Sequence, residues 1–220
     1  AFASEAPGRA HALWVLEELL EDPAIIGPDE RATLARLRAE DHHFPVAMMW
    51  ATEHDPELAL RLTIAATSYL WMVDYRFTWF DELRRAIESG RSASPDLRAQ
   101  ALAAAAHSLA ENFADHVVAT AYATEALDHA RTSGDVETEL TAMLALASGA
   151  RNAGHLAEAI ELERETVKRA DEVGADLWAL RGTRWMAFAE MQRGNYETAL
   201  ALADDAQQRG DALGSDWVAA

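Results

Sequence analysis

The sequence predicts an all-α protein, an α-α superhelix of helical hairpins with a period of about 40 residues. Its composition is typical of helices: half of the 220 residues are apolar, alanine is abundant and β-branched residues are sparse. A turn, Gly154-His155-Leu156 followed by Ala159, recurs 40 residues later as Gly194-Asn195-Tyr196 with Ala199. Glycines at 134, 174 and 214 follow the same step. A repeat at this spacing indicates supersecondary units stacked as a solenoid.

The first part of the chain, residues 1–54, is expected to form capping or linker helices ahead of the repeats. Apolar residues on one face predict a helix over 9–20. Pro28 is suited to the first turn of a second helix, over 28–40. Pro45 interrupts the chain, and a third helix is expected over 44–53.

The repeat region is expected to cover residues 55–220 and to break off within a unit at its C-terminal end. Asp55-Pro56 and Ser94-Pro95 are typical helix starts, with a capping side chain followed by proline. Small residues at 119, 159 and 199 would let the two helices of a pair approach closely. Both chain ends look like cuts in a longer polypeptide. The expected helices are 56–73 with 76–89, 97–113 with 116–132, 137–153 with 156–172, and 177–193 with 196–212.

Charge and composition exclude several functions. The formal net charge of −18 lacks the basic footprint that binding to nucleic acid or an anionic membrane needs. The chain has no cysteine, which excludes disulfides, thiolate metal sites and a cysteine nucleophile. No apolar run approaches the roughly 18 residues of a membrane-spanning helix, and no signal peptide is recognisable. We expect a cytoplasmic protein that binds neither nucleic acid nor membrane.

The repeating turn resembles that of the tetratricopeptide repeat, whose core G-[DN]-[YFL]-x-x-A is matched by residues 194–199, GNYETA. The resemblance covers about residues 57–214, with Asp74-Tyr75 as a divergent first turn, and it implies a helical superhelix with a concave binding face. The period of 40 departs from the usual 34. The closing proline of that repeat is absent. A HEAT-type repeat has a compatible length and is the structural alternative.

A second resemblance lies upstream, in residues 37–51, LRAEDHHFPVAMMWA, and 55–62, DPELALRL. They resemble the opening of the tetratricopeptide arm in AfsR-like and LuxR-type STAND ATPase transcriptional regulators, with the pattern L-x-x-E-x-x-N-[LF]-R-x-A-L-x-W-A. His43 stands where that pattern has Asn, and Pro45 where it has Arg. The resemblance implies that NTPase and DNA-binding modules lie elsewhere, and that the helical arm senses an inducer or partner. The chain itself has no G-x-x-x-x-G-K-[ST] motif.

Residues at 40-residue intervals on the first helix of each pair would form ladders across a concave groove. Serines and amides in such ladders are suited to holding an extended peptide, because an amide offers a donor and an acceptor. Arginines there would supply local positive charge for an acidic ligand. Ordinary polar residues on an exposed face are the alternative. The predicted binding residues are Arg61, Ser68, Trp71, Met72, Ser108, Glu111, Asn112, Ser148, Arg151, Asn152, Arg181, Arg184, Phe188 and Gln192.

Other candidate sites are weaker. His42, His43 and His54 do not have the i, i+4 spacing that places two ligands on one helix face, so no metal site is predicted. The aromatic cluster over 69–80 favours a core over a ligand pocket. No nucleophile and base stand at a recognisable spacing, so no catalytic residues and no cofactor are predicted.

The sequence therefore predicts a non-catalytic module that binds a protein, peptide or small-molecule inducer. Its partners would include other domains of its own parent chain, as in the sensor arm of a bacterial regulator. Two alternatives stay open. One is a free-standing receptor for a peptide or small molecule, and the other is an oligomerisation scaffold.

Overall fold

The fold is all-α, as predicted, and is seen in a computed structural model that describes residues 2–21, 26–72, 80–111 and 115–215. Side chains are described from residue 6 onward, except at 71 and 72. In this part of the chain every regular element is a helix. The elements are α1 (Phe2–Leu20), α2 (Glu30–Glu40), α3 (His43–His54), α4 (Pro56–Met72), α5 (Phe80–Ser89), η1 (Gly90–Ser92), α6 (Pro95–Glu111), α7 (His116–Ser133), α8 (Val136–Asn152), α9 (Leu156–Val173), α10 (Asp176–Gln192) and α11 (Tyr196–Leu213).

The predicted helix boundaries agree closely with the observed ones from α6 onward. Upstream, α1 begins earlier than expected, with Pro7 inside it. Helix α2 begins at Glu30, because Gly27, Pro28 and Asp29 form a turn that the Glu30 N–H closes on the Gly27 carbonyl at 3.1 Å. The expected start of α5 near residue 76 lies outside the described residues.

Local signals account for the helix ends. Asp115 and Asp135 each accept a hydrogen bond at 3.1 Å from the backbone N–H three residues on, at the starts of α7 and α8. Gly154 and Gly194 have φ of 82°, the left-handed conformation that a helix reversal requires. Each reversal joins the two antiparallel helices of a pair. The turn expected to differ at Ala114 lies outside the described residues.

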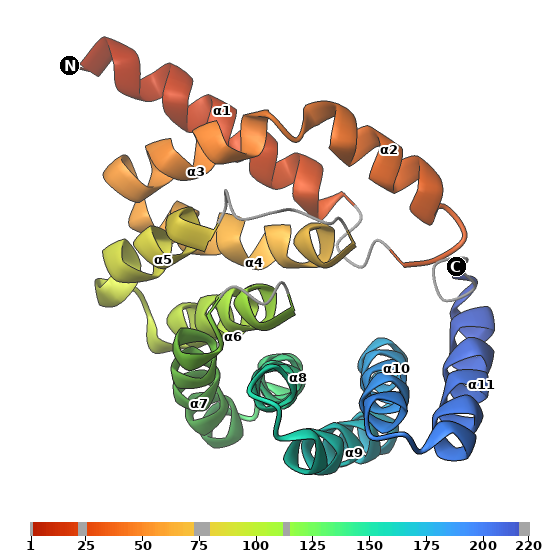
Figure 1. The fold of residues 1–220 in the computed structure, drawn as a ribbon. Coiled ribbons are helices and arrows are strands. Elements are labelled where there is room, and N and C mark those ends of the chain that lie inside the picture. Colours follow the sequence, from red (N-terminus) through yellow and green to blue (C-terminus); the bar gives the residue numbers. More distant parts are fainter. Residues whose placement is uncertain (1, 22–25, 73–79, 112–114, 216–220) are drawn as a thin grey trace.

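Helices that follow one another pack together from α6 to α11, and α6 also packs on α8. Figure 1 shows these helices following an arc, with α1 to α5 on the other side of the molecule. The end of α11 comes back to the start of α2, where Ser215 Oγ donates to Glu30 Oε2 at 2.8 Å and both residues are buried.

The buried side chains of the core become smaller along the chain. Toward the N-terminus it contains large side chains, including Phe44 and Tyr69, whose rings meet edge to face. Buried Phe80 also supports the expectation of an aromatic core, whereas Tyr75, Phe77 and Trp79 lie outside the described residues. This core continues across the expected boundary at residue 54 to α8. From α6 onward alanine predominates.

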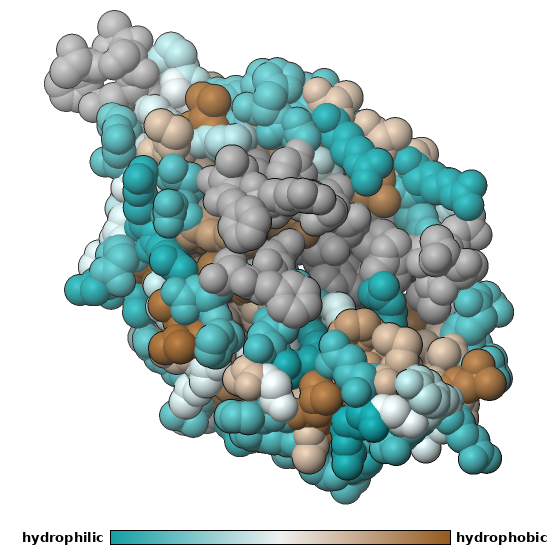
Figure 2. All heavy atoms as spheres, in the orientation of Figure 1, coloured by the Kyte–Doolittle hydropathy of each residue, from teal (hydrophilic) through white to brown (hydrophobic). Residues whose placement is uncertain are grey.

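The face shown in Figure 2 is mostly hydrophilic, with brown apolar patches separated from one another. No helix among the described residues is long and apolar enough to span a membrane.

The fully buried Ala159 on α9 gives a test of close helix packing. Ala159→Leu should lower the free energy of unfolding by about 1–3 kcal/mol, because the added atoms would force the paired helices apart. Urea denaturation measures this change. The control is Ala157→Leu, the same substitution at an exposed position of the same helix. Equal stability of the two variants would contradict close packing at Ala159.

Candidate functional site

A buried group of charged residues joins α6, α8, α9 and α10, and we call it the Arg151 network. The Arg151 side chain is 2% exposed, and its Nη1 lies 2.6 Å from Glu163 Oε1 on α9. Its Nη2 donates to Ser148 Oγ at 2.9 Å and lies 3.5 Å from Glu111 Oε1 on α6. Ser148 in turn donates to Glu111. The guanidinium stands 3.9 Å above the Trp185 ring of α10, a cation–π contact.

Each partner reaches the network because its helix directs a polar residue toward the core. On α9, Glu163 lies on the same face as the buried Ile160, Thr166 and Ala170. A carboxylate placed there must be paired, because an isolated buried charge is very costly. Asn152 Nδ2 donates to the Ala110 carbonyl at 2.6 Å, which satisfies a backbone acceptor in the last turn of α6.

Burial shifts the pKa values of the titratable side chains in and beside the Arg151 network. It raises the pKa of Glu163 to about 8, against the opposing effect of Arg151 and with a smaller contribution from Glu111. Burial also raises the pKa of Glu111, again against Arg151. His107, buried on α6, has its pKa lowered to about 3 by burial and by Arg181 and Arg151. His107 is therefore neutral at physiological pH.

Beside the network lies a cavity of about 600 Å³, which we call the inner cavity. Its lining comes from the first helices of successive pairs, with Ser68 on α4, Gln100 on α6, Thr141 on α8 and Arg181 on α10. Leu213, at the end of α11, also lines it. A volume of this size is typical of small-molecule sites.

Arg181 belongs to both features. It is 4% exposed, lines the inner cavity, and interacts electrostatically with Glu111 of the network and with Glu137 at the start of α8. Burial lowers the pKa of Arg181 to about 10, and the two carboxylates oppose that effect. Arg181 is therefore still charged at neutral pH.

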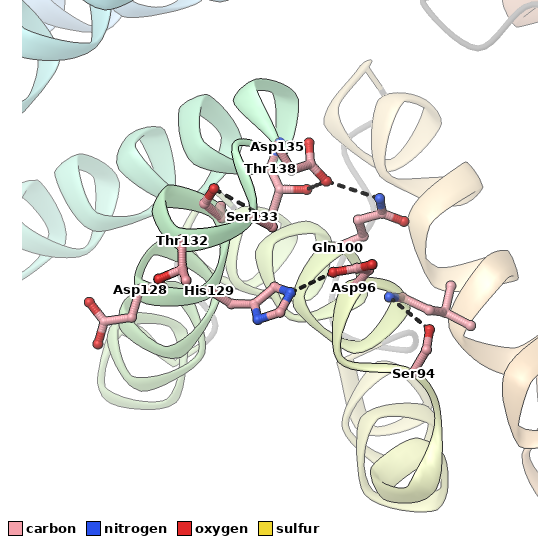
Figure 3. Close-up of polar contacts among 11 residues, drawn as sticks. Ser94, Asp96, Gln100, Asp128, His129, Thr132, Ser133, Asp135 and Thr138 are labelled. Atoms are coloured by element: carbon pink, nitrogen blue, oxygen red, sulfur yellow. Dashed lines mark hydrogen bonds and ion pairs between the residues drawn. The ribbon is translucent and has the colours of Figure 1, made fainter.

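One wall of the inner cavity is held by Asp135, the residue before α8. Its Oδ2 accepts from Gln100 Nε2 at 3.0 Å and from Thr138 Oγ1 at 2.8 Å, which ties α8 to α6 (Figure 3). Burial acts to raise the pKa of Asp135, but the hydrogen bonds from Gln100 and Thr138 outweigh it and hold the pKa below its ordinary value. Asp135 is therefore ionised.

The structure brings together many of the predicted binding residues, but in two separate roles. Glu111, Ser148, Arg151 and Asn152 are hydrogen-bonded within or beside the Arg151 network. Ser68 and Arg181 line the inner cavity. Because two glutamates and Ser148 surround the Arg151 guanidinium, we assign its charge to internal pairing.

The remaining predicted residues lie elsewhere. Arg184, about five-sixths of a turn past Arg181, has its pKa lowered by burial, with Glu111 opposing the shift. Phe188 meets Trp185 edge to face at 5.6 Å. Ser108 is buried on α6, and Arg61 and Gln192 are exposed. Asn112 and the side chains of Trp71 and Met72 lie outside the described residues.

Sequence reasoning missed Glu163, His107, Gln100, Trp178 and Asp135 as members of these features. For two of these residues the sequence contains a recognisable sign of a buried polar role. Glu163 interrupts the apolar face of α9, and His107 lies inside an alanine-rich stretch that is otherwise apolar. A polar residue on a core face indicates a buried partner. Gln100 and Trp178 had no comparable signal, because their roles depend on how the helices cross.

The described residues contain no group of three or more His, Asp or Glu side chains arranged to hold a metal ion. The histidines considered in the sequence pack against aromatic rings instead. The His43 ring lies 5.0 Å from the Trp14 ring, and the His54 ring stacks on Trp50 at 5.0 Å.

Comparison with known proteins adds no family: no protein-family model and no curated protein sequence matches the chain.

Removing Arg151 tests the network. Arg151→Met should lower the free energy of unfolding by about 3–5 kcal/mol at alkaline pH, above the raised pKa of Glu163, because it leaves buried carboxylates without their cation. The loss should be smaller at lower pH, where Glu163 carries a proton. Arg164→Met, at a position whose side chain is 55% exposed and paired on the surface, should cost less than about 1 kcal/mol. Urea denaturation distinguishes the two, and equal effects would contradict a buried network.

The raised pKa of Glu163 predicts a pH dependence of stability. Folding takes up a proton between the ordinary value of 4.5 and about 8, so the free energy of unfolding should fall as pH rises through this range. Below the ordinary histidine value of 6.5, His107 acts oppositely, because only the unfolded chain binds its proton. Between pH 6.5 and about 8, titration of Glu163 should lower the free energy of unfolding by up to about 1.4 kcal/mol per pH unit.

Urea denaturation across the range from neutral to pH 8.5, roughly the upper end of the Glu163 titration, measures that slope. Glu163→Gln should flatten it, because glutamine keeps the shape and has no titrating proton. Glu165→Gln, at an exposed position of the same helix, should leave it unchanged. An unaltered slope in Glu163→Gln would assign the effect to another group.

Proposed function

We propose that the chain is a non-catalytic ligand-binding module whose ligand occupies the inner cavity. The observation that carries this proposal is the cavity itself, about 600 Å³ in volume and lined by the first helices of successive pairs. Helices from distant parts of the chain supply its walls, so a bound ligand would contact several pairs at once. Binding would therefore act on the arrangement of the pairs.

We also propose that the helices from α4 onward form a tetratricopeptide-like superhelix. Supporting it are the 40-residue step, the left-handed glycines at 154 and 194, and the buried alanines at 119, 159 and 199. In such an array the first helices line the concave side, which agrees with the helices that line the inner cavity. HEAT-type stacking is the alternative.

For the biological role, we propose the sensor arm of a cytoplasmic bacterial signalling or transcriptional regulator of the STAND type. The resemblance in residues 37–62 supports it. Leu213 lines the inner cavity two residues before Ser215, which bonds to Glu30. A ligand touching Leu213 would thus act on the contact between α11 and α2, and through it on domains of the parent chain. A phosphate-binding loop encoded upstream in the parent reading frame would support this role.

Two alternatives predict different behaviour in solution. A free-standing receptor binds a peptide or small molecule and needs no further module. An oligomerisation scaffold has a mass that rises with concentration and binds no small ligand, which sedimentation measures directly.

Ligand-dependent thermal stabilisation tests the proposed cavity. A ligand at a hundred times its Kd should stabilise the folded chain by about 2.7 kcal/mol. Ser68→Phe, which fills the cavity from α4, should abolish the stabilisation, whereas Ser92→Phe, at an exposed position away from the cavity lining, should keep it. A metabolite library screened by thermal shift supplies the ligands. Stabilisation that survives Ser68→Phe would place binding elsewhere.

A further inference from the structure

We infer that the inner cavity binds a small organic cation, a protonated amine or amidinium on an apolar body. This inference rests on the proposed function, because it assigns a ligand class to the same cavity. Its basis is the charge and shape of the lining.

Negative charge exceeds positive charge around the inner cavity. Among the described residues, Asp135, Glu137 and Asp176 supply three carboxylates to the lining, and Arg181 is its only cationic side chain. Arg181 also interacts electrostatically with Glu111 of α6 and with Glu137 of α8. Its positive charge is therefore offset within the protein.

The first turns of two helices, α8 and α10, also line the inner cavity, and a helix start favours anions. Each start carries about half a positive charge, so both together offset about one carboxylate. At α8 the capping position is already taken, because Asp135 accepts from the Thr138 N–H. Three carboxylates, set against Arg181 and about one positive charge from the two helix starts, leave the described lining with a net negative charge, which favours a cation.

The carboxylates are placed to meet a ligand. Asp135 is held in the wall by Gln100 and Thr138, and the Glu137 backbone also contributes a hydrogen bond to its carboxylate. Glu137 and Asp176 are exposed, at the first turns of α8 and α10, and they form the rim of the cavity.

Apolar groups supply the rest of the lining. Trp178 Nε1 donates to Thr141 Oγ1 at 3.2 Å, which fixes the indole ring in the wall. Ile64, Ala104 and Leu213 add aliphatic surface. A fixed indole and carboxylates together suit an ammonium group, because aromatic faces attract cations. The cavity thus matches a ligand that is cationic at one end and apolar at the other.

Three probes of one shape and different charge test the inference: phenethylamine, phenethyl alcohol and hydrocinnamate. Saturation-transfer NMR measures binding of each probe. The experiment uses physiological salt, because salt screens the general attraction of a cation to the acidic surface of the chain. Phenethylamine should bind most tightly and hydrocinnamate least. Ser68→Phe should remove binding at the inner cavity.

A charge-neutralising pair of substitutions identifies the source of the preference. Glu137→Gln with Asp176→Asn should weaken phenethylamine by about three- to tenfold, since exposed ion pairs are each worth up to about 1 kcal/mol. The affinity for phenethyl alcohol should change less than about twofold, because the alcohol carries no charge. The matched control is Glu158→Gln with Glu197→Gln, which makes the same charge change in the first turns of α9 and α11, away from the cavity.

The outcomes separate the two claims. If no probe shows binding that Ser68→Phe removes, the proposed cavity function fails. If hydrocinnamate or the alcohol binds there as tightly as phenethylamine, the cavity function stands and the cation assignment is overturned. Equal weakening by the rim pair and the control pair would also overturn it, because the attraction would then come from the whole acidic surface.

Discussion

The close approach of paired helices is the constraint on which the rest of the structure depends. A core built from alanine gains contacts only when helix backbones lie near one another. At two close approaches the chain has glycine in place of alanine: a Cβ at Gly182 would lie 2.7 Å from Val167 Cγ2, and one at Gly149 would lie 2.8 Å from Thr120 Oγ1. With wider spacing, Arg151 would not reach partners on three helices.

The Arg151 network and the inner cavity are two consequences of this spacing. Buried ion pairs add little net stability compared with apolar packing, but they penalise arrangements that leave a charge unpaired. Glu111, Arg151 and Glu163 therefore favour one relative placement of α6, α8 and α9. Arg181 extends this effect to the cavity wall, because both Glu111 and Glu137 interact with it electrostatically. The shape of the binding cavity and the pairing of charges are thus linked.

Helices could be predicted from the sequence because their ends carry local signals. Asp135 caps α8 through a contact three residues away, and Gly194 allows the reversal between α10 and α11 through its own φ angle. The 40-residue spacing also predicted that Ser148, Arg151 and Asn152 lie on the first helix of their pair, which is α8. It did not foresee Glu163, because it considered only the first helix of each pair. Pairings such as Asp135 with Gln100, or Glu30 with Ser215, depend on crossing angles that no short segment encodes.

The Glu30–Ser215 contact changes how the array gains and loses order. In an open solenoid each unit depends only on its neighbours, so the ends fray independently. Here the bond joins residues separated by 185 positions, and the added Cβ of any larger residue at Gly214 would press on Pro28 at 3.1 Å. Opening at α2 therefore exposes the end of α11 as well. Order at α2 and order at the end of α11 are therefore coupled, and such a non-local contact slows folding, because a long loop must close before it forms.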